Sequence, residues 1–305
     1  MRLDRYMLAL ATALLAACAT VPDAPERGVL FDDFTYASPA NMAQNGWILR
    51  AAPGWPGVPG ATWGPESFSI HDDPAAPGNR VVRMTSVTDG SGAGTRQTQF
   101  CHERKYKEGT FAARVRFTDA PAAGPDGDQI VQTFYLIAPL KAPMDLDYSE
   151  TDFEYLPNGG WGEQGATMFA TTWETFHPEP EWKADNESST LKGSYAGWRT
   201  LVLQIRDGKV RYFVDDELLA DHSERVYPEE PMSVNFNLWF VRDGLLPVGP
   251  KRVWVEDVDW VYHRQGEILT VDEVEAFVAE LRREGVAFRD TVPRLDPPLV
   301  SPCDF

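Results

Sequence analysis

The sequence predicts an all-β protein, a two-sheet antiparallel β-sandwich followed by a short C-terminal helix and tail. Short segments in which β-branched or aromatic residues alternate with polar ones recur from about residue 29 to residue 263. Clusters of Gly, Pro, Asn and Asp separate these segments, as turns do. Helical patterns do not come between the segments, and many consecutive strands without helices favour a sandwich.

Nine segments carry the strand pattern. They are RVVRMTSV (80–87), GTFAARVRF (109–117), QIVQTFYLI (129–137), ETDFEYL (150–156), ATMFATTW (166–173), WRTLVLQI (198–205), KVRYFVDDELL (209–219), MSVNFNLWF (232–240) and RVWVEDVDWVY (252–262). Asp207-Gly208 predicts a hairpin tip between two of them. We expect loops at the Pro/Gly-rich residues 51–66 and 119–128, and at the acidic residues 178–190.

One helix is predicted after the strands. Thr270 and Glu273 form a capping box, an apolar stripe follows, and Gly285 suits the stop of the helix. We therefore expect one domain over residues 29–263, with residues 264–305 packed on it as a helix and tail. No repeat and no second unit of independent size is visible, and we expect a monomer.

Composition limits the class of partner. The chain has 305 residues and a formal net charge of −18, which repels phosphate backbones and makes a nucleic-acid partner improbable. Ten Trp, ten Tyr and sixteen Phe suit contacts with sugar rings, although core packing would also use them. The five histidines are scattered and no CxxC or HExxH spacing occurs, so a zinc site is not expected.

The N-terminus has the pattern of an export signal. Arg2 and Arg5 precede an apolar run that is too short to span a bilayer. Residues 15–18, LAAC, resemble the lipobox of bacterial lipoproteins, which implies a signal peptide over residues 1–17 and a lipid on Cys18. Residues 18–28 would then be a tether, and the protein would be anchored in the cell envelope, at the outer membrane or cell surface. The alternative is an ordinary secretory signal.

Two further cysteines, Cys101 and Cys303, remain after this signal. Export places them in an oxidising compartment, where a pair favours a disulfide that would tie the tail to the domain. The alternative is two separate thiols.

The segment 150–156 places carboxylates at every second position: Glu150, Asp152 and Glu154. In a strand these three share one face, and the intervening Thr, Phe and Tyr point into the sandwich. A solvated acidic face would explain an arbitrary pattern of this kind. Two carboxylates that flank a glycosidic bond can instead divide the work of nucleophile and general acid. Their side chains must then converge, which requires a concave sheet.

The same residues resemble the active-site strand of glycoside hydrolase family 16, whose pattern is E-x-D-x-E. Segments 108–117 and 128–137 resemble the two strands before that motif, and segments 198–219, 232–240 and 253–263 resemble the strands after it. The resemblance covers about residues 29–263. It implies a concanavalin A-like jelly roll and retaining hydrolysis of a β-linked, glucan-like polysaccharide, with transglycosylation as a possible second outcome.

The resemblance also assigns roles to individual residues. It makes Glu150 the nucleophile, Glu154 the general acid/base and Asp152 the residue that tunes Glu150. Asn237 and Trp239 match positions that border the cleft, and no cofactor is required for catalysis. Asp259 matches a position that helps to bind a structural calcium in some members. Further candidates for sugar contacts are Trp161, Trp55, Trp63 and Trp173, each with packing as the alternative.

Two other functions compete with a hydrolase. A non-catalytic carbohydrate-binding lipoprotein could use the same scaffold, because a fold does not fix a function. A structural lipoprotein of the envelope would need neither the acids nor the tryptophans for a ligand. The intact acidic triple favours the enzyme, since a binding protein gains nothing from three crowded carboxylates.

Overall fold

The structure is a computed structural model that describes residues 28–73, 76–300 and Cys303. The predicted signal peptide, the lipidation site at Cys18 and all of the tether except Gly28 lie outside these residues. Within the described ranges, no helix combines the length and the apolar character that a membrane crossing requires.

The described residues form seventeen strands, one α-helix and three 3-10 helices. The strands are β1 (Val29–Asp32), β2 (Ile48–Leu49), β3 (Thr62–Trp63), β4 (Phe68–Asp72), β5 (Arg80–Thr88), β6 (Arg96–Cys101), β7 (Gly109–Phe117), β8 (Ile130–Ile137), β9 (Glu150–Leu156), β10 (Thr167–His177), β11 (Lys183–Lys192), β12 (Gly197–Arg206), β13 (Lys209–Val214), β14 (Glu217–His222), β15 (Ser233–Phe240), β16 (Arg252–Gln265) and β17 (Phe288–Asp290). The helices are η1 (Pro39–Asn45), η2 (Pro65–Ser67), η3 (Glu224–Val226) and α1 (Val271–Arg283).

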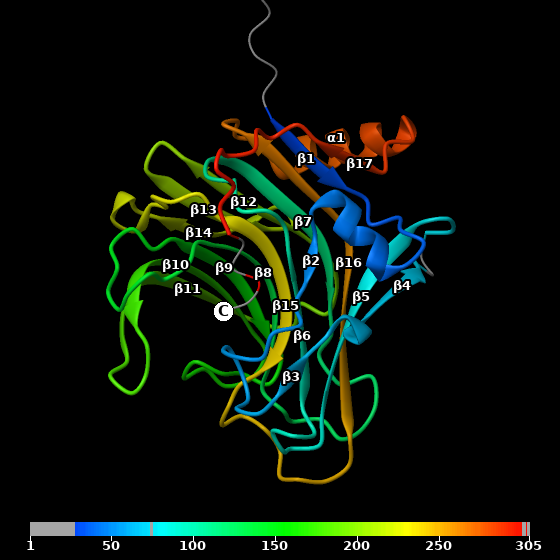
Figure 1. Cartoon of the computed structure of the whole chain (residues 1–305), viewed down its shortest axis with the longest axis vertical. Coiled ribbons are helices and arrows are strands. Elements are labelled where there is room, and N and C mark those ends of the chain that lie inside the picture. The colour runs from blue at the N-terminus through cyan, green and yellow to red at the C-terminus, as the bar shows by residue number, and fades with distance from the viewer. Residues whose placement is uncertain (1–27, 74–75, 301–302, 304–305) are drawn as a thin grey trace, which may run out of the picture.

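The strands form two sheets that meet at β6, and the predicted sandwich is confirmed. One sheet has the order β2-β6-β15-β8-β9-β10-β11, with every pairing antiparallel. The other contains β17-β1-β16, then β5 with β4 on one branch and β7-β12-β13-β14 on the other. Figure 1 shows β15 and β8 to β11 curving around an open space, so this first sheet has a concave outer face.

The core lies between the sheets and is crossed by a ladder of aromatic rings. Phe100 stacks on Phe236 with ring centroids 4.8 Å apart, and Phe236 lies 5.2 Å from Phe134. Phe134 stacks on Phe153, whose edge contacts Tyr212 of the opposite sheet at 5.0 Å. These residues come from consecutive neighbours β6, β15, β8 and β9, which fixes the register of the concave sheet.

All nine predicted strand segments are strands, with two corrections. Residues 178–190 were expected to form a loop, but residues from Lys183 onward form β11. This strand lies at the sheet edge, where the backbone pairs with β10 while polar side chains remain in water. Residues 209–219 were expected to be one strand, but Asp215, with φ of +53°, turns the chain between β13 and β14.

The predicted helix is confirmed as α1. The Thr270 hydroxyl accepts a hydrogen bond from the Glu273 backbone N–H. The Glu273 carboxylate accepts one from the Thr270 backbone N–H at 2.8 Å. The buried face of α1 packs with Phe31, Ala112 and Trp260 on the outer side of the second sheet. The helix therefore covers the convex face. It does not lie over the concave face.

The tail takes a different path from the helix. After β17 pairs with β1, Arg294 forms an ion pair with Glu103, and Leu299 bridges to Arg104 beyond the end of β6. Cys303 then forms the predicted disulfide with Cys101 on β6. The tail thus rounds the edge of the sandwich and reaches the concave sheet.

Candidate active site

Strand β9 presents the acidic triple on the concave face. Phe153 and Tyr155 are fully buried in the core between the sheets, and Thr151 points the same way. The alternation of a strand therefore places Glu150, Asp152 and Glu154 on the opposite face, as predicted. Glu150 and Glu154 are half-buried and Asp152 is buried.

Neighbouring strands surround the triple with paired side chains. On β10, Trp173 lies opposite Glu150, Thr171 opposite Asp152 and Phe169 opposite Glu154. On β8, the partners in the same order are Ile137, Tyr135 and Thr133. Because directly paired residues on one sheet face contact one another, each carboxylate has an apolar or hydroxyl-bearing neighbour on both sides. None of these six neighbours is charged.

Each carboxylate also has its own hydrogen-bond donor. The Tyr148 hydroxyl donates a short hydrogen bond to Glu150 Oε2. Trp173 Nε1 donates to Asp152 Oδ2 at 2.8 Å, and Trp161 Nε1 donates to Glu154 Oε2 at 3.1 Å. Asp152 and Glu150 also share a hydrogen bond. Three separate donors hold the three acids in place, which a solvated acidic face would not need.

Burial and mutual repulsion keep protons on the triple at neutral pH. Loss of water raises the pKa of Glu150 to about 8 and that of Glu154 to about 7. Burial, and then the charges of both neighbours, raise the pKa of Asp152 well above its usual range. A protonated Asp152 donates its proton in the hydrogen bond to Glu150. Asp152 and Tyr148 both donate to Glu150 and lower its pKa, yet burial keeps that pKa above the pKa of Glu154.

Two aromatic clusters flank the carboxylates along β9. Beyond Glu154, the ring centroid of Trp161 lies 5.8 Å from that of Trp239, and Trp239 belongs to an apolar cluster with Val131, Leu156 and Phe169. The cluster beyond Glu150 is built around Phe176 of β10. Its rings are those of Tyr148, Trp173, Trp182 and Trp55, with centroids 5.3, 5.8, 5.6 and 6.3 Å from Phe176. Trp55, Trp161 and Trp182 are about half exposed and present faces on which sugar rings can stack.

The concave face also carries a polar chain across β15. Asn237 hydrogen-bonds Thr133 and donates to the Tyr135 hydroxyl, which also accepts from Gln99 Nε2 at 2.8 Å. Arg50 Nη1 donates to Gln99 Oε1 at 2.7 Å, and the Arg50 guanidinium lies 3.9 Å from the centre of the Trp63 ring. Trp63 is buried there, and we assign it a packing role in the loop of residues 50–63 in place of the predicted sugar contact.

Comparison with known proteins agrees with this architecture. No protein-family model and no curated protein matches the sequence. Among solved structures, a LamA variant from Zobellia galactanivorans with bound laminaritriose and laminaritetraose aligns with a TM-score of 0.57 and 13% identity, over 78% of this chain and 99% of that one. The β-glucanase of Bacillus licheniformis aligns with a TM-score of 0.55 and 14% identity, over 78% and 98%. A family 16 endo-glucanase from Bacteroides ovatus aligns with a TM-score of 0.56 and 14% identity, over 76% and 98%.

The fold is that of family 16 glycoside hydrolases. At these identities the likeness concerns the fold, and the roles of individual residues depend on the geometry described above.

Within this family 16 fold, the structure adds site residues that the sequence analysis missed. Tyr148 shares the parity of Glu150 and could have been found by extending the alternation two residues upstream. Tyr135 lies in a predicted strand and Phe176 lies three residues beyond the predicted end of another, and their proximity to the acids depends on strand order. Trp182 was assigned to a loop and carried no signal of its own.

The expected calcium at Asp259 does not fit its surroundings. Both carboxylate oxygens of this buried residue accept hydrogen bonds from cations or amides: Arg114 at 2.7 Å, Arg282 at 2.8 Å and Asn79 at 2.7 Å. Two guanidinium groups already neutralise the carboxylate and would repel Ca²⁺. Across the described residues, no group of three or more His, Cys, Asp or Glu side chains is arranged to hold a metal.

Proposed function

We propose that the protein is a retaining glycoside hydrolase that cleaves a β-linked, glucan-like polysaccharide. The observation that supports this most is the acidic triple on a concave, aromatic-lined sheet, with one dedicated donor for each carboxylate. The complex of a protein of the same fold with laminaritriose and laminaritetraose supports the substrate class.

In the first step Glu150 attacks the anomeric carbon, and the bond from that carbon to the bridging oxygen breaks. Glu154 gives its proton to the departing oxygen, so one sugar chain leaves as an alcohol while the other remains as an ester of Glu150. Burial raises the pKa of Glu154 to about 7, so this proton is still available near neutral pH. The reactive form of the pair carries its one proton on Glu154 and leaves Glu150 as the anion. The Asp152 and Tyr148 donors hold Glu150 oriented and stabilise its charge before the attack.

In the second step Glu154, now ionised, takes a proton from water as the water oxygen attacks the anomeric carbon. The ester bond to Glu150 breaks and the product keeps its original anomeric configuration. A sugar hydroxyl can replace water in this step, which would make the enzyme a transglycosylase. The half-exposed Trp161 and Trp55 provide faces that can hold such an acceptor.

The second candidate is a carbohydrate-binding protein without catalysis. The exposed tryptophans alone would serve that role. The crowded acids oppose it, because three carboxylates of which one is buried and two are half-buried destabilise the fold and give a neutral sugar no extra affinity. A purely structural envelope protein would leave both features unexplained.

The test is release of reducing ends from laminarin, lichenan and barley mixed-linkage glucan by the wild type and by Glu150→Gln. We expect hydrolysis of at least one glucan by the wild type and loss of that activity in the variant. Glu280→Gln, on the exposed side of α1, is the matched control and should keep full activity. Binding without cleavage would favour the carbohydrate-binding protein. Absence of both binding and cleavage would favour the structural envelope protein.

We also propose that the protein is exported and held at the cell envelope by a lipid on Cys18. The sequence of residues 1–18 is the basis of this proposal. The Cys101–Cys303 disulfide supports export, because such bonds persist in oxidising compartments. Metabolic labelling with a fatty-acid probe, with and without Cys18→Ala, tests the anchor.

A further inference from the structure

The direction of the sugar chain follows from the placement of the acids. Nucleophile and general acid must lie on opposite sides of the scissile linkage. Glu150 and Glu154 are spaced along β9, so the chain they cleave has to pass between them, across the strands. One part of the substrate then lies toward β10 and β11, and the other toward β8, β15 and β6.

A loop closes the β6 side of this path. Residues 50–63 fold down onto the concave face of β6, where Gln97 Oε1 accepts a hydrogen bond from the Val58 backbone and Gln97 Nε2 donates to Pro56 at 3.2 Å. The contact is tight, because a Cβ on Gly57 would lie 2.1 Å from Gln97 Oε1. Arg50 fixes the same loop by donating to the Trp55 carbonyl at 3.0 Å.

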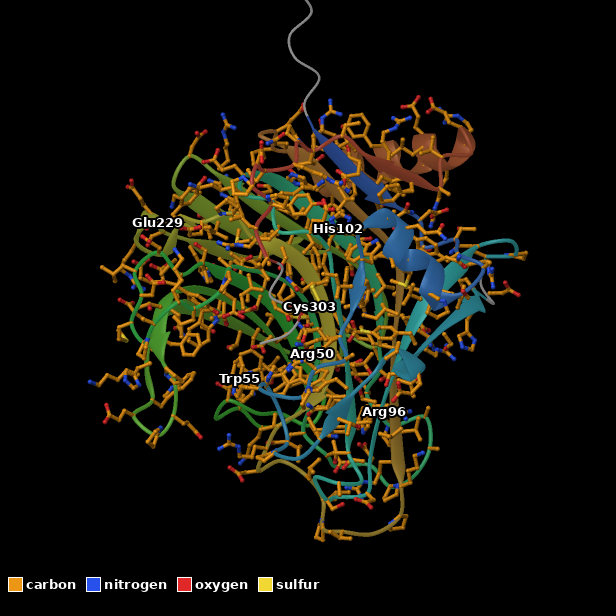
Figure 2. All side chains as sticks on the ribbon, in the orientation of Figure 1. Arg50, Trp55, Arg96, His102, Glu229 and Cys303 are labelled. Atoms are coloured by element: carbon orange, nitrogen blue, oxygen red, sulfur yellow. A yellow bond between two sulfur atoms is a disulfide. The ribbon has the colours of Figure 1, made fainter. Side chains whose placement is uncertain are left out.

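The loop also reaches across the sheet. Trp55 at its tip stacks on Phe176 of β10, four strands away from β6. Figure 2 shows Trp55 and Arg50 on the side of the molecule where the concave sheet lies, with Cys303 beside them. The loop therefore extends from β6 across the strands toward β10, next to the Glu150 end of the site.

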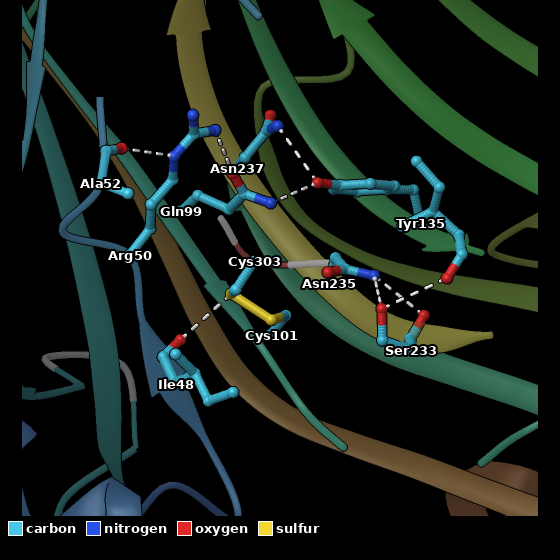
Figure 3. The surroundings of a disulfide bond; sticks show 11 residues. Ile48, Arg50, Ala52, Gln99, Cys101, Tyr135, Ser233, Asn235, Asn237 and Cys303 are labelled. Carbon is cyan, nitrogen blue, oxygen red and sulfur yellow. Dashed lines mark hydrogen bonds between the residues drawn. A yellow bond between two sulfur atoms is a disulfide. The ribbon is translucent and has the colours of Figure 1, made fainter. Parts of the chain in front are cut away.

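The tail extends this cover along β6. Cys101 pairs with Asn235 on the concave face, and Asn235 pairs with Tyr135, which in turn pairs with Asp152. The disulfide to Cys303 thus lies in the same cross-strand row as the central acid. Figure 3 shows the disulfide beside Asn235 and close to the Arg50–Gln99–Tyr135 chain. Adjacent strands are about 4.8 Å apart, so three spacings place the disulfide roughly 14 Å from β9.

Exposure on the two sides of β9 differs accordingly. Every side chain that β6, β15 and β8 direct to the concave face is buried: Gln97, Gln99, Cys101, Ser233, Asn235, Asn237, Trp239, Val131, Thr133, Tyr135 and Ile137. Toward β10 and β11, Phe169 and Thr171 are buried, Trp173 is half-buried, and Ser188 and Thr190 are exposed. The concave face therefore becomes open at β11 and is closed on the β6 side.

We infer that this closed side makes the site a dead end, which accepts only the terminal units of a β-linked chain beyond the cleavage point. The wall consists of residues 50–63 together with Cys303, which its disulfide to Cys101 holds on β6. The inference rests on the proposed function and specifies it: the enzyme removes short products of fixed length from one chain end. A sheet open at both sides would instead cut long chains at internal linkages.

The first test uses the wild-type protein on laminarin and barley mixed-linkage glucan. We expect one or two short oligosaccharides as the products from the earliest time points, with little loss of viscosity for each reducing end released. A broad ladder of products with a rapid fall in viscosity would overturn the inference while leaving the proposed hydrolysis intact. Absence of hydrolysis would instead count against the proposed function.

A binding measurement decides the inference even without turnover. Glu154→Gln is titrated by calorimetry with laminari-oligosaccharides of increasing length. We expect added sugar units to raise the affinity only when they extend toward the open side. A bulky group on the chain end that enters the closed side should therefore abolish binding, whereas the same group on the other end should be tolerated. Equal affinity for the two blocked forms would overturn the dead end, and absence of any binding would overturn both proposals.

A third test opens the wall. The chain is ended after Val292 and carries Cys101→Ser, which removes the tail and leaves β6 intact. We expect longer products and a larger viscosity loss for each bond cut. Cys101→Ser with Cys303→Ser in the full-length chain is the matched control, since the tail is still present. If the truncated protein is folded by its melting curve and yields the wild-type products, the tail is not part of the wall.

Discussion

Replacing Trp161 with phenylalanine isolates the effect of one hydrogen bond on the general acid. Trp161 Nε1 donates to Glu154 Oε2 at 3.1 Å and so lowers the pKa of Glu154, while burial raises it to about 7. Hydrogen bonds to charged groups contribute roughly 1.5 to 3 kcal/mol. Trp161 is 46% exposed, so solvent screening reduces this contribution to about 1 kcal/mol. At about 1.36 kcal/mol for each pKa unit, Trp161→Phe should raise the pKa of Glu154 by roughly 0.7.

The assay is the pH dependence of kcat/KM on the best glucan. The alkaline limb of this profile reports loss of the Glu154 proton, so it should move to higher pH in Trp161→Phe. Phenylalanine keeps the ring over Trp239 and limits entry of water, which preserves the burial of Glu154. Trp55→Phe, a change in a ring that contacts no carboxylate, is the control and should leave the limb in place. An alkaline limb that stays fixed or moves to lower pH in Trp161→Phe would refute the assigned role of Glu154.

Three further predictions concern stability. The pKa of Glu150 is higher in the folded than in the unfolded protein, so ionisation of Glu150 destabilises the fold increasingly between about pH 4.5 and 8. Glu150→Gln should therefore have a larger free energy of unfolding than wild type. The difference should grow over this pH range to the order of a few kcal/mol at pH 8. An equal margin at pH 4 and pH 8 would contradict this. Asp128→Asn leaves Arg252 buried without its partner and should cost about 3 to 5 kcal/mol in urea denaturation, against almost nothing for an exposed pair such as Arg283 with Glu280. Thr270→Ala removes the cap of α1 and should cost about 1 kcal/mol, whereas Thr270→Ser should cost far less.

Much of the fold could be predicted because its strands are amphipathic. The alternation in residues 150–156 determines which side chains enter the core, and burial of Phe153 and Tyr155 confirms that assignment. The cap of α1 is equally local, because Thr270 and Glu273 are close in sequence. Strand β11 could not be predicted from such a pattern. Its side chains are exposed or half-buried on both faces, and it is held by backbone pairing with β10.

The site was predictable only where its residues share a strand or a family motif. Glu150, Asp152 and Glu154 belong to one strand, and their common face follows from geometry alone. The donor from Trp161 depends on the path of a loop, and the contact between Trp55 and Phe176 spans four strands. The two cysteines suggested a disulfide, yet their place on the concave face follows from the parity of β6 and the order of the sheet. Contacts of this kind depend on tertiary arrangement, which local sequence does not encode.

The identity of the nucleophile is the central claim, and trapping the covalent intermediate tests it most directly. A 2-deoxy-2-fluoro β-glycoside with a good leaving group, made from the glucan unit that the enzyme prefers, slows breakdown of the ester. Peptide mass spectrometry should then find one added glycosyl group on Glu150, and Glu150→Gln should remain unlabelled. A label on Glu154, or turnover with inversion of the anomeric centre and no label at all, would contradict the account.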